Sequence, residues 1–307
     1  MDVITEIEEL QQLLKEDSSN LQARRRLATL LLDNGFNEEA LKQCLYLANI
    51  YPDDADSYYN LGIAYEKVKN YKLAKSAYQE AISRNSADPD YYYNLGMVCI
   101  ETQEFDEAIE NFNIVISTDE NDSNTYFNLG YCYFKKGDMV EALDNFNKTI
   151  ELNNNDYIAH FYLGNVFKEI GQNDMAIYEF QNVINIRPDY SWAYFNMASI
   201  YYEQGNLDDA IQNLHRTLQY NVNDIKACEI LAKIYIKLGN YSEAIEFLQN
   251  LSAQNEYNYD YYYILARIYK ELGDIDQYKA YLQLLIENED KVTYPVSLIK
   301  RELKKND

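Results

Sequence analysis

Apolar side chains recur along the chain with the spacing of amphipathic helices. In residues 58–65, a tyrosine, a leucine, a glycine and a second tyrosine stand at positions i, i+3, i+4 and i+7, which share one face of an α-helix. A second stripe follows after a turn, with a small residue and then a large one, as in Ala142 and Phe146. Small residues on facing stripes let two helices approach closely. The pattern predicts an all-α chain made of short helix pairs.

This pattern returns every 34 residues without insertion. A small residue stands at one fixed place in the first helix of each unit, called here the small-residue position: Ala28, Gly62, Gly96, Gly130, Gly164, Ala198, Ala232 and Ala266. A second series lies 12 residues later: Ala40, Ala74, Ala108, Ala142, Ala176, Ala210, Ala244 and then Tyr278. Such a period is typical of a solenoid, in which each unit buries its apolar faces against its neighbours.

All ten glycines of the chain follow the same frame. Four occupy the small-residue position, and the other six lie seven residues after it: Gly35, Gly137, Gly171, Gly205, Gly239 and Gly273. A glycine at that point ends the first helix, because glycine takes a left-handed backbone at little cost. Each unit is therefore predicted to be a helix, a turn and a second helix.

We expect eight such units with a capping helix at each end. The predicted bounds are 21–54, 55–88, 89–122, 123–156, 157–190, 191–224, 225–258 and 259–292, with caps at 1–20 and 293–307. Both end segments carry apolar residues on one face and charged residues elsewhere, as a terminal unit needs a polar outer face for solubility. Tyr278 breaks the second series, so we expect altered packing in the last helix pair.

The unit resembles the tetratricopeptide repeat (TPR). In the second unit the matching positions are Tyr58, Leu61, Gly62, Tyr65, Ala74, Tyr78 and Ala81, while Pro52 and Pro188 stand at the family's closing proline. The resemblance spans nearly the whole chain and implies a right-handed superhelical α-solenoid of tandem helix-turn-helix units. It also implies a non-catalytic scaffold that binds a peptide segment of another protein in its concave groove. The family serves many partners, so the partner stays open.

The chain is strongly acidic, with a formal net charge of −23. Long-range repulsion from phosphate argues against nucleic acid or an anionic membrane as the main partner, although the acidity could equally serve solubility. No signal peptide and no transmembrane stretch is visible. The four cysteines, Cys44, Cys99, Cys132 and Cys228, are scattered, which suggests reduced thiols in the cytoplasm.

Candidate binding residues follow from the family resemblance, which implies that first helices face the groove. Asparagines stand two residues before the small-residue position in four units: Asn60, Asn94, Asn128 and Asn196. Amides can pair with a peptide backbone of any sequence, although asparagine is also simply frequent in this repeat. Asn165 lies on the same side of the fifth unit.

Aromatic residues stand beside these amides. They are Tyr59, Tyr93, Phe127, Tyr131, Phe161, Trp192 and Phe195. Aromatic rings provide large contact areas and are enriched at interfaces. The alternative is that these rings pack against the next unit, and the sequence leaves both interpretations open.

Cations gather on the first helices of the seventh and eighth units, with Lys226, Lys233 and Arg267 as the main candidates. One interpretation is a clamp for an acidic segment or a terminal carboxylate; the other is a solvated face, on which Glu229, Asp260 and Glu271 dilute the positive charge. The carboxylate clamp of chaperone-binding TPR proteins needs Lys and Asn in one unit, Asn in the next, and Lys and Arg in a third. No three consecutive units supply that set.

No catalytic or cofactor motif is present in the sequence. His160 falls on a core stripe and His215 on a second helix, and neither has the neighbours of a zinc site or a triad. We therefore expect no enzyme, no cofactor and no metal. The alternative function is a structural assembly factor or self-associating scaffold that uses the outer face and the ends, and the oligomeric state is open.

Overall fold

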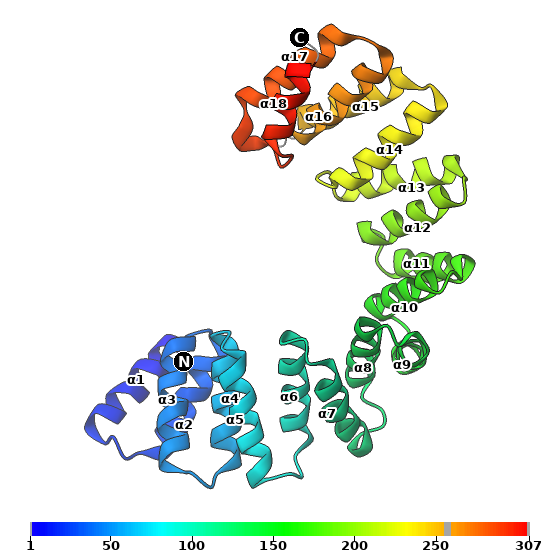
Figure 1. The fold of residues 1–307 in the computed structure, drawn as a ribbon. Coiled ribbons are helices and arrows are strands. Elements are labelled where there is room, and N and C mark those ends of the chain that lie inside the picture. Colours follow the sequence, from blue (N-terminus) through cyan, green and yellow to red (C-terminus); the bar gives the residue numbers. More distant parts are fainter. Residues whose placement is uncertain (1, 255–258, 306–307) are drawn as a thin grey trace. The chain divides into compact units, whose positions relative to one another are not determined.

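The structure, a computed structural model, describes residues 2–254 and 259–305 (Figure 1). Every regular element in these residues is a helix, which confirms the all-α prediction. A helix α1 (Val3–Glu16) comes first, and a 3-10 turn η1 (Glu289–Lys291) and a helix α18 (Val296–Lys305) come last. Between them lie helix pairs: α2 (Leu21–Asp33) and α3 (Asn37–Ile50), α4 (Ala55–Lys67) and α5 (Tyr71–Arg84), α6 (Pro89–Glu101) and α7 (Phe105–Thr118), α8 (Ser123–Lys136) and α9 (Met139–Leu152), α10 (Tyr157–Glu169) and α11 (Asn173–Ile186), α12 (Ser191–Glu203) and α13 (Leu207–Tyr220), α14 (Ile225–Leu238) and α15 (Tyr241–Gln254), α16 (Asp260–Leu272) and α17 (Ile275–Glu287).

The chain divides into two compact units, Met1–Tyr162 and Leu163–Asp307, called unit 1 and unit 2 here. Within each unit, the two helices of a pair pack on each other, and each pair packs on the next along the chain (Figure 1). The core of each unit is therefore a series of small apolar clusters, as expected when stacked repeats bury their faces on neighbours.

Side chains with the repeat period fix where the first helices begin. Asn20, Asp54, Asp88, Asp122 and Asp156 each accept a hydrogen bond from a backbone N–H of the first turn that follows. Such caps satisfy amide groups that have no partner inside the helix. The polar capping positions thus recur with the same 34-residue period as the apolar positions.

Left-handed residues end several of the first helices, as the glycine series predicts. All six glycines of that series have φ between +77° and +87°. In the second and third helix pairs (α4 with α5, and α6 with α7), the same position is held by Lys69 and Gln103, at φ of 60° and 61°. A side chain in this region costs energy that glycine avoids, so the turn geometry is imposed by the repeat and does not depend on glycine alone.

A close contact inside four of the helix pairs lies at the small-residue position. In unit 1, Gly62, Gly96 and Gly130 lie against the fully buried rings of Tyr78, Phe112 and Phe146, so close that an added Cβ would come within 3 Å of a ring carbon. Gly164 meets Phe180 in the same way in unit 2. Where the small residue is alanine, the matching position of the second helix holds a smaller side chain: Cys44, Leu214, Leu248 or Leu282. Ring and glycine are therefore matched partners.

The last pair departs from the alanine series of the second helices at Tyr278, as the sequence suggests. The Tyr278 ring is fully buried in a cluster with Ala266, Leu282 and Ile299 of α18. Its hydroxyl donates a hydrogen bond to Glu302 at 2.9 Å. The bulky ring thus joins α17 to the C-terminal helix α18.

Candidate binding surface

Amides and tyrosines of consecutive first helices are joined in unit 1. Asn94 Nδ2 on α6 donates to the Tyr59 hydroxyl on α4 at 3.0 Å, and Asn128 Nδ2 on α8 donates to the Tyr93 hydroxyl on α6 at 3.2 Å. The repeat therefore places each of these asparagines beside the tyrosine of the preceding helix pair. Burial raises the pKa of both tyrosines, which keeps their hydroxyls protonated.

These predicted contact residues are thus partly used within the fold. The Nδ2 groups of Asn60 and Asn94 also donate to backbone carbonyls one turn back on their own helices. Asn128 is 9% exposed and the others are half-buried. In the described part of the chain, the side-chain oxygens of Asn60, Asn94 and Asn128 accept no hydrogen bond, so acceptors remain on this surface. We call Tyr59, Asn60, Tyr93, Asn94 and Asn128 the amide row.

An aromatic cluster continues unit 1 beyond the amide row. Tyr162 stands where four of the other helix pairs have asparagine. Its ring centroid lies 5.7 Å from that of Phe127 and 5.5 Å from that of Tyr131. The Phe161 ring lies 5.8 Å from Tyr162. Phe127, Tyr131 and Phe161 are half-buried, so they both pack on neighbouring rings and present an edge at the surface. The sequence does not reveal that Tyr162 is the centre of this cluster.

A cavity at the other end of the amide row was not anticipated. It has a volume of about 210 Å³ and lies between α2 and α4, lined by residues that include Arg25, Thr29 and Asn60. Arg25 pairs with Asp54 at 3.2 Å, and Asp54 also caps α4. This arginine therefore serves contacts between the first two helix pairs.

Unit 2 begins its surface with an exposed tryptophan. Trp192 on α12 is 51% exposed and meets the half-buried Phe195 ring edge-on, with centroids 6.2 Å apart. Asn196 has both of its amide atoms engaged, since Nδ2 donates to the Trp192 carbonyl and Oδ1 accepts from Lys168 Nζ. Asn165, on α10, is half-buried. On α12 it is therefore the Trp192 side chain, and not the Asn196 amide, that is free to contact a partner.

The predicted cations lie on α14 and α16. Lys226, Lys233 and Arg267 are all exposed. Lys233 and Arg267 come together at one small cavity of about 20 Å³, which is also lined by Ile236, Ile264 and Ile268. The structure therefore brings two of the three cations to the same spot, with Lys226 two turns back from Lys233 on α14.

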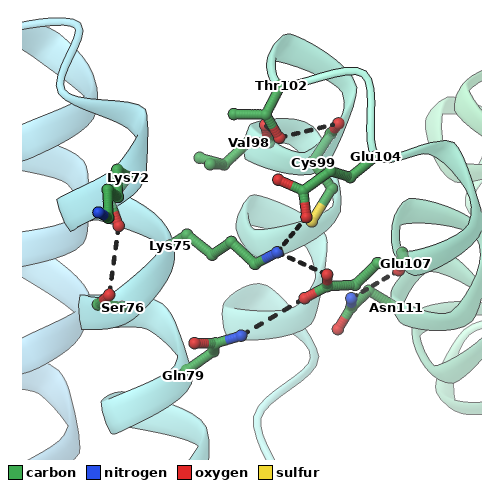
Figure 2. A network of polar contacts seen from close by, with 10 residues as sticks. All are labelled: Lys72, Lys75, Ser76, Gln79, Val98, Cys99, Thr102, Glu104, Glu107 and Asn111. Carbon is green, nitrogen blue, oxygen red and sulfur yellow. Dashed lines mark hydrogen bonds and ion pairs between the residues drawn. The ribbon is translucent and has the colours of Figure 1, made fainter.

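Polar contacts on the second helices form a separate network between α5 and α7 (Figure 2). Lys75 Nζ donates to Glu104 and, at 2.6 Å, to Glu107, which also accepts from Gln79. Burial opposes the charge of Lys75, yet its carboxylate partners outweigh burial and raise its pKa. Lys75 in turn lowers the pKa of Glu104. This network holds neighbouring helix pairs together.

The cysteines and His160 are packed inside the fold, and His215 is half-buried. All four cysteines are buried, and burial raises the pKa of Cys44, Cys99 and Cys132 to about 12. His160 is buried, and burial lowers the pKa of His215, whose ring lies against Phe247. Over residues 2–254 and 259–305, no group of three His, Cys, Asp or Glu side chains could hold a metal ion. None of the described helices is both long and apolar enough to cross a membrane.

Family models match most of the chain. Models of the tetratricopeptide repeat match residues 55–88, 89–122, 123–156, 202–268 and 235–294, and a TPR repeat model matches 164–205. A search of curated proteins finds no match.

Solved structures with the same fold include other repeat proteins. The C-terminal part of a TPR repeat-containing protein from Cytophaga hutchinsonii has a TM-score of 0.65 at 18% identity, covering 75% of this chain and 95% of that chain. YrrB, described as a TPR protein with an unusual peptide-binding site, has a TM-score of 0.52 at 23% identity, covering 60% and 95%. MamA from Desulfovibrio magneticus has a TM-score of 0.54 at 19% identity, covering 56% and 97%. At these identities the likeness concerns the fold alone.

Proposed function

Because the chain belongs to the tetratricopeptide-repeat family, we propose that it is a non-catalytic scaffold that binds a polypeptide segment of another protein on its first helices. The proposed repeats run from 21 to 292 in steps of 34 residues, with α1 and α18 as caps. We place the protein in the cytoplasm, where its four free cysteines stay reduced. Its net charge of −23 argues against nucleic acid as the partner.

Exposure of Trp192 is the observation that carries this proposal. An aromatic side chain of this size, half exposed and supported from one side by Phe195, is the kind of rigid anchor that dominates binding energies at interfaces. The first helices of unit 1 separately carry amides and rings that suit a polypeptide. YrrB, which has the same fold, is described as having a peptide-binding site.

The test uses the fact that Trp192 is the single tryptophan of the chain. Peptides selected from a random displayed library on the immobilised full chain should change the fluorescence of Trp192 when they bind. Trp192→Ala should then weaken their binding by about 2 kcal/mol or more, as for an interface hot spot.

Tyr178→Ala provides the matched control, because this tyrosine is 60% exposed but lies on the second helix α11. Peptides that bind both variants as tightly as the parent chain would place the binding surface elsewhere. Failure to select any peptide would contradict the proposed function.

The amide row is a second part of the proposed surface. Replacing Asn94 and Asn128 by alanine should weaken peptide binding, because their side-chain oxygens can accept from a peptide N–H. The same change removes the bonds to Tyr59 and Tyr93, so the control is Tyr59→Phe with Tyr93→Phe, which removes those bonds and leaves the amides in place. Binding should fall in the alanine pair and persist in the phenylalanine pair, as measured by fluorescence anisotropy. Equal losses in both pairs would mean that the amides act only within the fold.

The alternative function is structural assembly through the second helices. Val140, Met175 and Tyr178 are exposed apolar side chains on α9 and α11, and such side chains favour contacts between proteins. Light scattering of the full chain distinguishes the two functions. A concentration-dependent oligomer that is broken by Tyr178→Ala and that binds no selected peptide would favour assembly.

A further inference from the structure

Exposed cations gather on two first helices of unit 2. Lys226, Lys233 and Lys237 recur on α14 at a spacing that keeps them on one face, and Arg267 and Lys270 do the same on α16. All five are exposed. Among the described residues, none of their charged groups forms an ion pair or a side-chain hydrogen bond. We call these five residues the cationic patch.

Carboxylates outnumber cations in the chain by 50 to 27, and several cations on other helices are paired with them. Lys75 contacts two glutamates, Lys136 contacts two aspartates, and Arg25 and Arg26 each contact one acid. The absence of ion pairs at these five cations is therefore not a consequence of scarce carboxylates. Their charges produce a local positive electrostatic field that attracts an anion from another molecule.

Two of the nearby carboxylates are bound to other partners, whereas Glu271 on α16 is exposed beside Lys270. Glu229 on α14 accepts a hydrogen bond from the Tyr294 hydroxyl at 2.5 Å. Asp260, at the start of α16, is fully buried and accepts from the backbone N–H of Thr293 at 2.8 Å and from its hydroxyl. The segment that leads into α18 thus holds two acids that could otherwise have paired with the cationic patch.

An apolar cavity lies inside the cationic patch. It is lined by Ala232, Ile236, Ile264 and Ile268, and by the charged residues Lys233, Arg267 and Glu229. Its volume of about 20 Å³ leaves room for little more than the tip of one aliphatic side chain. The cavity therefore adds an apolar contact between two positive charges.

We propose that the cationic patch binds an acidic polypeptide segment of a partner protein, in which one aliphatic side chain is flanked by carboxylates. The aliphatic tip enters the isoleucine cavity, and the carboxylates meet Lys233 and Arg267. Arginine and lysine clusters recognise acidic motifs through charge-assisted hydrogen bonds. The remote negative charge of the chain does not prevent this, because at physiological ionic strength fields are screened beyond about 8 Å. This inference rests on the proposed function and names the chemistry of the partner.

Fluorescence anisotropy of labelled synthetic peptides tests the inference on the full chain. The first peptide alternates glutamate and aspartate around one leucine. The second replaces every acid by its amide, the third replaces the leucine by serine, and the fourth replaces every acid by lysine. We expect the first peptide to bind most tightly, and the second and third to bind more weakly.

Charge reversal then locates the site. Lys233→Glu with Arg267→Glu should weaken binding of the first peptide by about tenfold or more, equivalent to about 1.4 kcal/mol. The matched control is Lys42→Glu with Lys72→Glu, which changes the net charge equally at exposed positions of the second helices α3 and α5 and should leave binding within about twofold. Circular dichroism of each variant confirms that the helices are retained.

Three results would overturn the inference. Equal losses in the two charge-reversal variants would mean that net charge alone controls binding. Tighter binding of the amide or lysine peptide than of the acidic one would exclude an acidic partner and leave the proposed scaffold function standing. Binding of none of the four peptides would also exclude it, and the proposed function itself would then fail only if the Trp192 selection yields no peptide.

Discussion

Glycine on the first helix of a pair is matched by an aromatic ring on the second helix, and this match can be tested at single residues. An alanine at position 130 would put its Cβ 2.8 Å from a ring carbon of Phe146. Overpacking of this kind costs about 1–3 kcal/mol, whereas alanine is better than glycine in a helix by about 1 kcal/mol. Gly130→Ala should therefore destabilise the chain by up to about 2 kcal/mol in denaturant unfolding.

A double-mutant cycle separates the two contributions. In a Phe146→Leu background, Gly130→Ala should become stabilising, because alanine faces leucine in the same way at Ala198 and Leu214. The coupling free energy should lie near 1–3 kcal/mol, on the scale of residues in contact. An effect of Gly130→Ala that is the same in both backgrounds would mean that the ring does not set the identity of the small residue.

At the scale of elements, the C-terminal helix α18 completes unit 2 by covering the last helix pair. Ile299 is fully buried against Tyr278 and Leu282, while its neighbour Leu298 is 51% exposed. Ile299→Ala should reduce the free energy of unfolding by about 2–5 kcal/mol, and Leu298→Ala should change it by less than about 0.5 kcal/mol. Hydrogen exchange should report faster exchange in α16 and α17 for the first variant only.

Tyrosine hydroxyls add polar contacts to the same helix. Tyr263 and Tyr278 both donate to Glu302, at 3.0 and 2.9 Å. If Ile299→Ala left the exchange of α17 unchanged, the burial of Ile299 would not be what stabilises the last pair.

At the scale of the whole chain, the repeat period predicted the elements but not the contacts between repeats. Helix positions and the role of the small residues depend on local patterns, so they could be read from the sequence. Contacts such as Asn94 with Tyr59 depend on the angle between one helix pair and the next. The sequence of a single helix pair does not encode that angle. The same holds for Asn196, whose oxygen is taken by Lys168. Tyr278 could be recognised as an exception, but its partner Glu302 depends on how the following segment packs back.

Alkaline pH offers a test of the buried core along the whole chain. Burial raises the pKa of Cys44, Cys99 and Cys132 to about 12, whereas an unfolded cysteine has a pKa of about 8.5. Burial likewise raises the pKa of Tyr78 and Tyr91. Because the folded pKa values are raised, their stabilising effect is complete below the unfolded values and is lost as the pH rises through the folded values.

The free energy of unfolding should therefore fall between about pH 8.5 and pH 12, by at most about 1.4 kcal/mol per pH unit for each such group. Urea unfolding at a series of pH values measures this slope, and a thiol reagent should modify the cysteines only as the chain unfolds. Cys132→Ala should lower stability at neutral pH yet reduce the slope, because it removes one buried group that ionises in the unfolded chain. A stability that stays constant up to about pH 11, or thiols that react at once in the folded chain, would mean that these side chains are open to water and that the small clusters between repeats are looser than the packing described above.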